Sequence, residues 1–151
     1  MTVIVNGLDE LRARIGEHLG NSEWLEVTQD RVNTFADATD DDQWIHVDVE
    51  RAKAGPFGGP IAHSFLTLSL LIPLWTELLE LRGIGMAVNY GLNKVRFPSP
   101  VPVGSRIRLG ASLAEVRDVA TGVEAVIDAV IECDGTAKPV CVAQAVHRYY
   151  A

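Results

Sequence analysis

The chain has 151 residues, of which 48 % are hydrophobic and 22 % are charged, which is the composition of one globular domain. We therefore expect a single domain over residues 1–151, with a core large enough to fold without disulfides or a structural metal. The formal net charge of -7 and the lack of basic runs argue against nucleic acid as a partner, because phosphate contacts need surfaces of Lys and Arg.

The N-terminal sequence MTVIVNGLDELRARIG contains no basic leader and no long apolar run, so we expect no signal peptide. The two cysteines, Cys133 and Cys141, have neither the spacing of metal ligands nor the number of a disulfide framework. We expect a reduced, cytoplasmic protein, and we assign the cysteines no chemical role.

In chain order, the first predicted element is an amphipathic helix over residues 7–19, where apolar side chains recur at three- and four-residue steps. Residues 24–27, WLEV, alternate as a short strand does. Thr28 is a good N-cap for a second helix over residues 29–39. The inward stripe of this helix contains Val32, Phe35 and Ala36.

The longest apolar segment, residues 61–81, follows a loop rich in Gly and Pro at residues 54–60. A membrane span needs about 20 residues with few polar interruptions, whereas this segment contains several polar side chains and a proline. We expect a buried central helix that is kinked or broken at Pro73.

After this segment the pattern changes to the two-residue period of β-strands and keeps it to the end of the chain. Four long strands are predicted, over residues 86–97, 105–119, 121–134 and 138–150. The turns ATG and DGT are short enough to form hairpins, so the strands around them should be antiparallel. A long apolar helix followed by such strands predicts an α+β fold in which the sheet wraps the helix.

The stretch DATDDDQWIHVD, residues 37–48, contains five carboxylates and one histidine. The stretch does not fit a calcium loop, since Asp42 occupies the position that needs glycine and the last residue is Asp48, where a longer Glu is usual. Zinc has less support, because His46 and His63 have no thiolate partner at a useful spacing. A solvated helix end is the simplest alternative, but clustered acids at a helix C-terminus oppose the helix dipole, which suggests another reason for them.

Asp41 and His46 are five residues apart, so only a turn can bring their side chains together. In such a turn a carboxylate and an imidazole can hold one water, which is what the addition or removal of water beside a carbonyl requires. The developing enolate oxygen also needs donors, and the start of a helix supplies free N–H groups. We expect this helix to begin at Pro60, with the amides near His63 and Ser64 facing the loop.

These segments together resemble the MaoC-like (R)-specific enoyl-CoA hydratases. That family has the hot-dog fold and a motif that reads roughly S/T-G-D-x-N-P-x-H, followed by I/V-x-H-G at the start of the central helix. Thr39 matches the Ser/Thr, Asp41 the catalytic aspartate and His46 the catalytic histidine, while His63-Ser64 falls on the His-Gly. The resemblance extends over most of residues 24–150.

The departures from the family motif are Asp40 for glycine, Gln43 for asparagine, Trp44 for proline and Ser64 for the oxyanion-hole glycine. Asp40 places a second carboxylate beside Asp41 or points to solvent. Ser64 keeps a backbone N–H, which is the only group that an oxyanion hole requires.

The resemblance implies hydration of trans-2-enoyl-CoA to (R)-3-hydroxyacyl-CoA, or the reverse dehydration, in fatty-acid metabolism, with no cofactor and no metal. It assigns catalysis to Asp41 and His46 and the oxyanion contact to the Ser64 N–H. The side chains expected to bind substrate are Gln43, His63, Asn89, Lys94 and Arg96. His63 also fits a purely structural hydrogen bond at the helix start, and the basic pair also fits an ordinary exposed strand face.

Two other functions remain compatible with the sequence. Hot-dog acyl-CoA thioesterases share the fold, but many of them place a carboxylate on the central helix, and residues 61–76 contain none. A non-catalytic subunit that binds acyl-CoA is the third possibility, supported by Asp40 in place of the family glycine. We also expect a homodimer and no membrane partner, because a sheet with one face on a single helix leaves an edge strand exposed.

Overall fold

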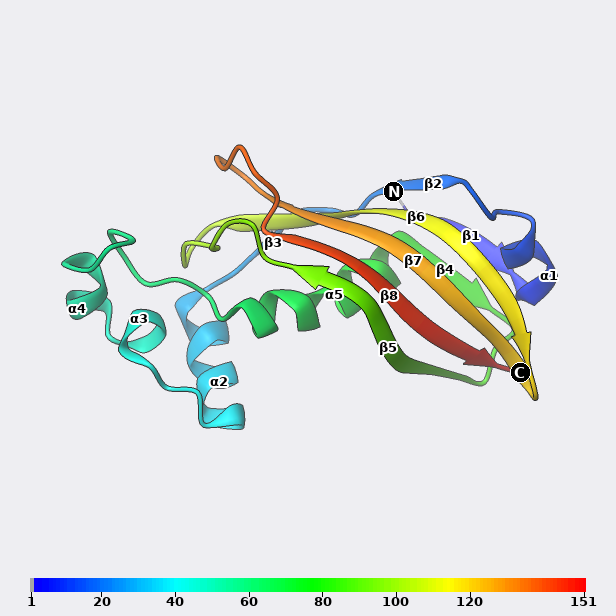
Figure 1. Cartoon of the computed structure of the whole chain (residues 1–151), viewed down its shortest axis with the longest axis horizontal. Coiled ribbons are helices and arrows are strands. Elements are labelled where there is room, and N and C mark those ends of the chain that lie inside the picture. The colour runs from blue at the N-terminus through cyan, green and yellow to red at the C-terminus, as the bar shows by residue number, and fades with distance from the viewer. Residues whose placement is uncertain (1) are drawn as a thin grey trace.

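The computed structural model describes residues 2–151 and consists of a long helix, α5 (Ser64–Leu78), wrapped by an antiparallel sheet (Figure 1). Five strands follow in the order β2-β6-β7-β8-β5, and the short strand β3 also pairs with β6. Their bounds are His18–Asn21 (β2), Leu25–Glu26 (β3), Met86–Arg96 (β5), Arg106–Val119 (β6), Gly122–Cys133 (β7) and Cys141–Tyr150 (β8). This is the α+β hot-dog arrangement, so the predicted fold class is confirmed.

The four long strands lie where the two-residue period predicts them. The hairpins β6–β7 and β7–β8 form at the ATG and DGT turns, with antiparallel registers such as Val119 opposite Gly122. Strand β5 instead pairs with β8, the last strand in the chain, and therefore lies at the edge of the sheet. This long-range pairing fixes which strand is left with an open edge.

Helix α5 spans Ser64–Leu78 and is shorter than the predicted segment. The prediction that it begins at Pro60 is wrong: Ile61 forms an isolated bridge with Pro102, and the Ala62 N–H donates to the Val101 carbonyl at 2.8 Å. These bonds hold residues 60–62 in an extended path. At the other end the chain leaves the helix and becomes strand β4, Leu79–Arg82, which pairs in parallel with β1, Val3–Asn6.

Pro73 lies inside α5 and does not break it. The proline has no N–H to donate to the carbonyl four residues earlier, so one helical bond is lost. Neighbouring side chains on the inward face, including Leu70, Leu71 and Leu74, are buried and hold the helix on both sides of this position.

The prediction of a helix over residues 7–19 is correct only for its first half. Helix α1 spans Gly7–Arg12, whereas Leu19 belongs to strand β2. The backbone turns at Gly16, which has φ of 86° and donates its N–H to the Leu113 carbonyl at 2.7 Å. Leu19 is buried from a strand, so its helical spacing from the preceding apolar residues is coincidental.

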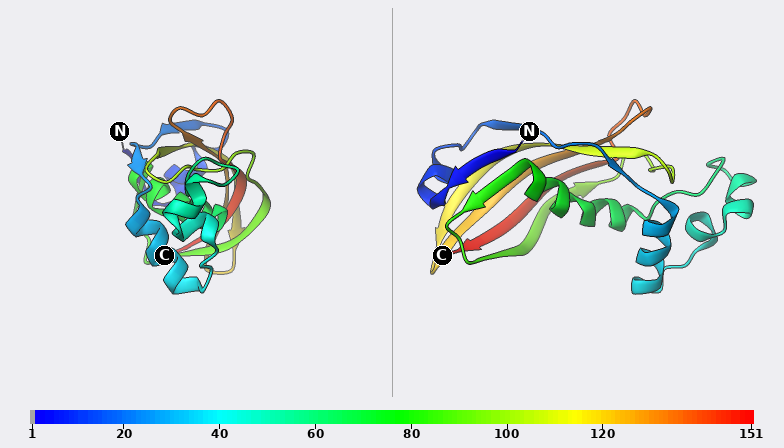
Figure 2. Two further views of the ribbon diagram at one scale, coloured as in Figure 1. Left: turned by 90° about the vertical axis from the view of Figure 1, so that its left-hand side faces the viewer. Right: turned by 180° about the vertical axis from the view of Figure 1, so that it is seen from behind.

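Helix α2, Gln29–Thr39, agrees with the prediction, and the Thr28 hydroxyl caps it by accepting from the Arg31 N–H at 3.1 Å. Two short helices follow, α3 at Trp44–Val47 and α4 at Val49–Lys53. All three lie beyond one end of the sheet, near the start of α5 (Figures 1 and 2). This end of the molecule is called the helical lobe below, residues 29–53.

The core lies between the inward face of α5 and the concave face of the sheet. Its largest buried side chains include Leu71, Leu78, Ile107, Leu109, Leu113, Ile127 and Ile131. Burial of each such side chain contributes roughly 1.5–3 kcal/mol, which makes this layer the main source of stability. Among the described residues, no helix is both long and apolar enough to cross a membrane.

One polar network is buried in this core, where α5 meets β8. The Trp75 indole N–H donates to the Tyr149 hydroxyl at 2.9 Å, and that hydroxyl lies 3.2 Å from Nδ1 of His147. Burial raises the pKa of Tyr149 to about 12 and lowers the pKa of His147 to about 4, so both side chains are neutral at pH 7.

Asp40 ends helix α2 in the left-handed conformation, with φ of 57° and ψ of 24°. Within residues 2–151 it is the only non-glycine residue with positive φ. Glycine adopts this conformation without steric cost, and aspartate tolerates it better than most residues. The backbone therefore accounts for glycine in the family motif at this position, and Asp40 keeps the same turn.

Replacing Asp40 by glycine should raise the free energy of unfolding by up to about 1 kcal/mol, because it relieves left-handed strain that exceeds the entropy glycine adds to the unfolded chain. Asp40→Ala is the matched control, since it removes the same charge but keeps Cβ. Urea unfolding of the three proteins measures the difference. If Asp40→Ala raised the free energy of unfolding as much as Asp40→Gly, then charge and not backbone conformation would set the stability at this position.

Candidate active site

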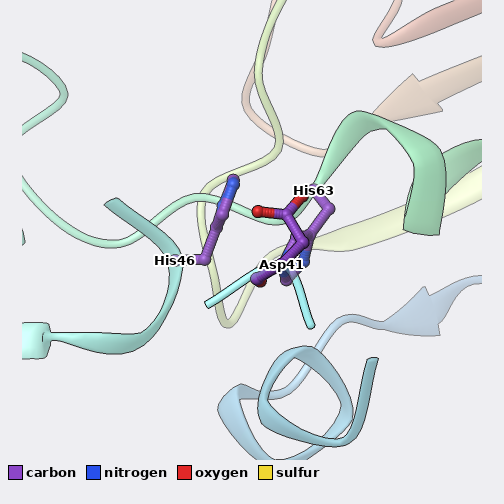
Figure 3. A group of neighbouring side chains, drawn as sticks. All are labelled: Asp41, His46 and His63. Atoms are coloured by element: carbon purple, nitrogen blue, oxygen red, sulfur yellow. The ribbon is translucent and has the colours of Figure 1, made fainter. Parts of the chain in front are cut away.

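A hollow of about 300 Å³ lies where the helical lobe meets the start of α5. The segments that meet there are the turn after α2, the short helix α3 and the extended residues that precede α5 (Figure 3). Its lining residues are Asp41, Ile45, His46, Ile61, Ala62, His63, Ser64 and Phe65. The structure thus brings together four residues that the sequence singled out: Asp41, His46, His63 and Ser64.

His46 is buried, and its ring is held by a backbone carbonyl. Nδ1 lies 2.6 Å from the Ile61 carbonyl oxygen, which can only accept, so Nδ1 carries the proton and donates it. The other ring nitrogen, Nε2, is then left with a free lone pair. Burial is the largest influence on the pKa of His46 and lowers it, so the ring is neutral at pH 7.

His63 connects the start of α5 to the turn that carries Asp41. Its Nε2 donates to the Asp41 backbone carbonyl at 2.8 Å, and its ring stacks on that of His46 with 3.9 Å between centroids. The Phe35 ring packs against it at 4.8 Å. Through these contacts His63 links the start of α5 to the turn that carries Asp41 and to the His46 ring. Its Nδ1 is buried and has no hydrogen-bond partner in residues 2–151.

Asp41 is exposed and follows the left-handed residue that ends α2. The reversal of the chain at this point turns Asp41 back toward His46, although five residues separate them. Possible ligand atoms of Asp41, His46 and His63 all lie within 4.8 Å of one another. A carboxylate and an imidazole therefore border one hollow, which is the arrangement that general acid/base chemistry on a water requires.

Donors for a developing oxyanion are present at the other side of the hollow. Ser64 is the first residue of α5, and the first intrahelical hydrogen bond is that of Thr67 to the His63 carbonyl, at 3.1 Å. The N–H groups before Thr67 have no acceptor within the helix. The Ser64 N–H can accordingly donate to a carbonyl oxygen placed in the hollow.

Two histidines and a carboxylate are also residue types that ligate metals. The two rings, however, are stacked with 3.9 Å between their centroids and an angle of 24° between their planes, so their lone pairs lie in two nearly parallel planes. One ion at about 2.0–2.1 Å from both nitrogens cannot lie near both ring planes. The rings would have to unstack before they could share a metal.

The other residues predicted from the sequence do not line this hollow. Gln43 is exposed, and its backbone carbonyl accepts a hydrogen bond from the His46 backbone N–H in α3 at 3.0 Å. Asn89 lies on β5 beside other cavities, between that strand and α5. Lys94 and Arg96 are exposed at the C-terminal end of β5, on the same face of the sheet, and are not among the lining residues of the hollow. Asp40 is exposed and lies outside the lining.

Several contacts that position the site escaped the sequence analysis. The Gln29 side chain donates to the His46 carbonyl at 2.8 Å, and the Ile61 carbonyl fixes the tautomer of His46. Trp44 packs so close to Gly55 that a Cβ there would lie 2.9 Å from the indole. The Arg51 guanidinium covers the same ring at 4.3 Å from its centroid. Backbone carbonyls and glycine packing leave no pattern in the sequence, so these contacts could not be predicted from it.

Comparison with known proteins agrees with this geometry. The family described as MaoC like domain matches residues 10–133. The 3-hydroxyacyl-thioester dehydratase Z of Mycobacterium tuberculosis (strain H37Rv) is 54 % identical over 143 residues, which cover 94 % of this chain and 95 % of the relative.

Two solved structures share the fold at lower identity. The (R)-hydratase from A. caviae involved in PHA biosynthesis has a TM-score of 0.71 and 23 % identity, and covers 87 % of this chain and 95 % of its own. A MaoC-like dehydratase from Rhodospirillum rubrum has a TM-score of 0.72 and 20 % identity, with 90 % and 92 % covered. With its hot-dog fold, its acid/base hollow and a family match over most of its length, this chain belongs to the MaoC-like dehydratase family.

Proposed function

We propose that the protein is a hydro-lyase that adds water to trans-2-enoyl-CoA to give (R)-3-hydroxyacyl-CoA, and catalyses the reverse dehydration. The observation that carries this proposal is that a carboxylate oxygen of Asp41 lies within 4.8 Å of a ring nitrogen of His46, on a hollow that both residues line. The relative named 3-hydroxyacyl-thioester dehydratase supports the thioester class, and the structural neighbour named (R)-hydratase supports the handedness.

In the proposed reaction, Asp41 removes a proton from a water that His46 helps to hold. The water oxygen bonds to C3 of the enoyl group, and the electrons of the double bond move toward the thioester carbonyl. The Ser64 N–H donates to that carbonyl oxygen while it carries negative charge. The proton that Asp41 took from the water passes to the free Nε2 of His46, which delivers it to C2, so the atoms balance and both groups return to their starting states.

The acyl chain has a natural path along α5. Phe65, Leu68, Ile72 and Thr76 recur on one face of the helix, and all are at least partly exposed. Two cavities, of about 260 and 250 Å³, lie between this face and β5. We propose that the chain runs from the hollow into this groove and that Lys94 and Arg96 attract the phosphates of the coenzyme.

Thioester hydrolysis is the alternative activity. Helix α5 contains no carboxylate before Glu77, near its C-terminal end, so the central-helix carboxylate of many hot-dog thioesterases has no counterpart beside the hollow. A non-catalytic binding subunit was favoured by Asp40, but this residue lies outside the hollow and keeps the turn of the family glycine.

We further propose that residues 1–151 form one domain in a cytoplasmic homodimer. One core cluster extends from Val5 to Tyr149, which supports a single domain. Both cysteines are buried and free, in keeping with a reducing compartment. Strand β5 has an open edge and exposes four large apolar side chains, and pairing of two such edges would cover them. These side chains are Met86, Val88, Tyr90 and Leu92.

Substitutions can separate the roles of Asp41 and His46, called the dyad below, from those of the neighbouring acidic residues. Asp41→Asn removes the base and His46→Gln removes the imidazole, so each should lower kcat by roughly 10²–10⁴. The double variant should be little worse than either single one, because groups that act on one water are not additive. Asp42→Asn is the matched control in the same turn and should cost less than about tenfold. Steady-state kinetics with crotonyl-CoA measures kcat for each variant. Equal losses of kcat in Asp41→Asn and Asp42→Asn would contradict the assignment of Asp41 as the base.

Reaction type and handedness can be read from the same substrate. Crotonyl-CoA should lose its enoyl-thioester absorbance without release of free thiol, and chiral analysis should give mainly the (R)-3-hydroxyacyl product. Thiol release would instead identify a thioesterase. An (S) product would be compatible with the proposed roles of Asp41 and His46 but would contradict the proposed (R) geometry of water addition.

Light scattering should give twice the chain mass of 16.4 kDa at micromolar concentration. The substitutions Met86→Lys and Val88→Lys should shift the protein toward the monomer, because charged side chains oppose edge pairing. Val130→Lys is the control, since Val130 is 43 % exposed on β7, an interior strand. A wild-type monomer with full activity would rule out the homodimer as the working form.

A further inference from the structure

His147 is a buried histidine that the proposed chemistry does not use. It lies on β8, is 5 % exposed, and lines both cavities of the groove between α5 and β5. Its register partner across the β5–β8 pair is Asn89, so the two side chains share the face that looks toward α5. Asn89 lines both cavities as well.

The hydrogen-bond network fixes which nitrogen of His147 carries the proton. The Trp75 indole N–H can only donate, so the Tyr149 hydroxyl accepts from it. The hydroxyl proton of Tyr149 then needs an acceptor, and in the described chain the available one is Nδ1 of His147, at 3.2 Å. Nδ1 is therefore unprotonated.

The neutral ring consequently carries its proton on Nε2. Burial lowers the pKa of His147 to about 4, so the neutral form persists at pH 7. Across residues 2–151, no group accepts from this N–H. A donor without a partner, in a largely apolar cavity, is costly unless a ligand or water supplies an acceptor.

The position of His147 places this donor on the acyl path. The wall of the first cavity that faces it comes from α5 and includes Leu68, Leu71 and Ile72. Ile72 is eight residues after Ser64, which corresponds to about 12 Å along the helix axis. A chain whose carbonyl meets the Ser64 N–H would pass the imidazole well beyond its reacting carbons.

We propose that His147, with Asn89, binds an oxygen on the distal part of the acyl chain, so that the enzyme prefers chains with a carbonyl or hydroxyl group there. The inference rests on the proposed function, because it assumes that the groove holds the acyl chain. The Nε2–H of His147 donates to either kind of oxygen, and the Asn89 amide can donate to it or accept from a hydroxyl. A plain hydrocarbon chain leaves the donor unpaired, and sites built to bind a polar group discriminate strongly against analogues that lack it.

The direct test is a series of trans-2-enoyl-CoA substrates of one length, in which a keto or hydroxyl group occupies successive distal positions. At one position the wild-type kcat/KM should exceed that of the plain chain by at least about tenfold. His147→Phe keeps a ring but removes the donor, and should reduce this ratio to near one. His18→Phe, at an exposed histidine on β2, is the matched control and should keep the wild-type ratio.

The outcomes separate this inference from the function on which it rests. No hydration of any substrate would overturn the proposed function. Hydration of plain and oxygenated chains with equal kcat/KM at every position would overturn only the role of His147. Nitrogen-15 NMR of the wild-type protein at pH 7 gives an answer independent of variants: the spectrum should show His147 protonated at Nε2, and protonation at Nδ1 would overturn the proposed donor.

Discussion

Burial of helix α5 is the constraint on which the rest of the structure depends. The helix is apolar on most of its circumference, and its inward side chains, such as Leu71 and Leu78, are covered by the concave face of the sheet. The sheet has to curve around the helix to cover it, which gives the hot-dog shape. Because the helix is held along its length, its first residues are fixed in space, and the site is built against them.

The site then depends on holding a turn of the helical lobe against that helix start. Asp41 lies on the turn, and His63 reaches it from the last residue before α5. The Ile61 carbonyl and the Gln29 side chain hold His46 from two other segments. Each contact alone contributes on the order of 1 kcal/mol, but together they leave one orientation for each ring. Positional precision at the hollow thus comes from hydrogen bonds, whereas stability comes from the apolar layer.

The sequence predicts much of this fold because most of it is locally encoded. Strand periodicity and the two short turns suffice to predict β6, β7 and β8, and the Thr28 cap suffices to predict where α2 begins. The predictions for residues 7–19 and for Pro60 failed where hydrogen bonds from distant segments override local preference. The pairing of β5 with β8 and the hydrogen bond between Trp75 and Tyr149 are also long-range, and no spacing indicates them. Residue types and a family resemblance led to the prediction that Asp41 and His46 act together, and the structure places both on one hollow. The backbone carbonyls that hold the two histidine rings could not be predicted in this way.

The acidic turn has an electrostatic consequence for the way a substrate enters. Residues 37–48 contain five carboxylates, of which Asp41 lines the hollow, and the proposed substrate, a coenzyme A thioester, carries several negative phosphates at one end. Unscreened repulsion between them extends about 10 Å at 0.1 M salt. A substrate that approached with its phosphates toward the turn would be pushed away, whereas one with its phosphates toward the basic end of β5 would not. The same stretch that supplies the proposed base would therefore also select the direction in which a polyanionic substrate lies.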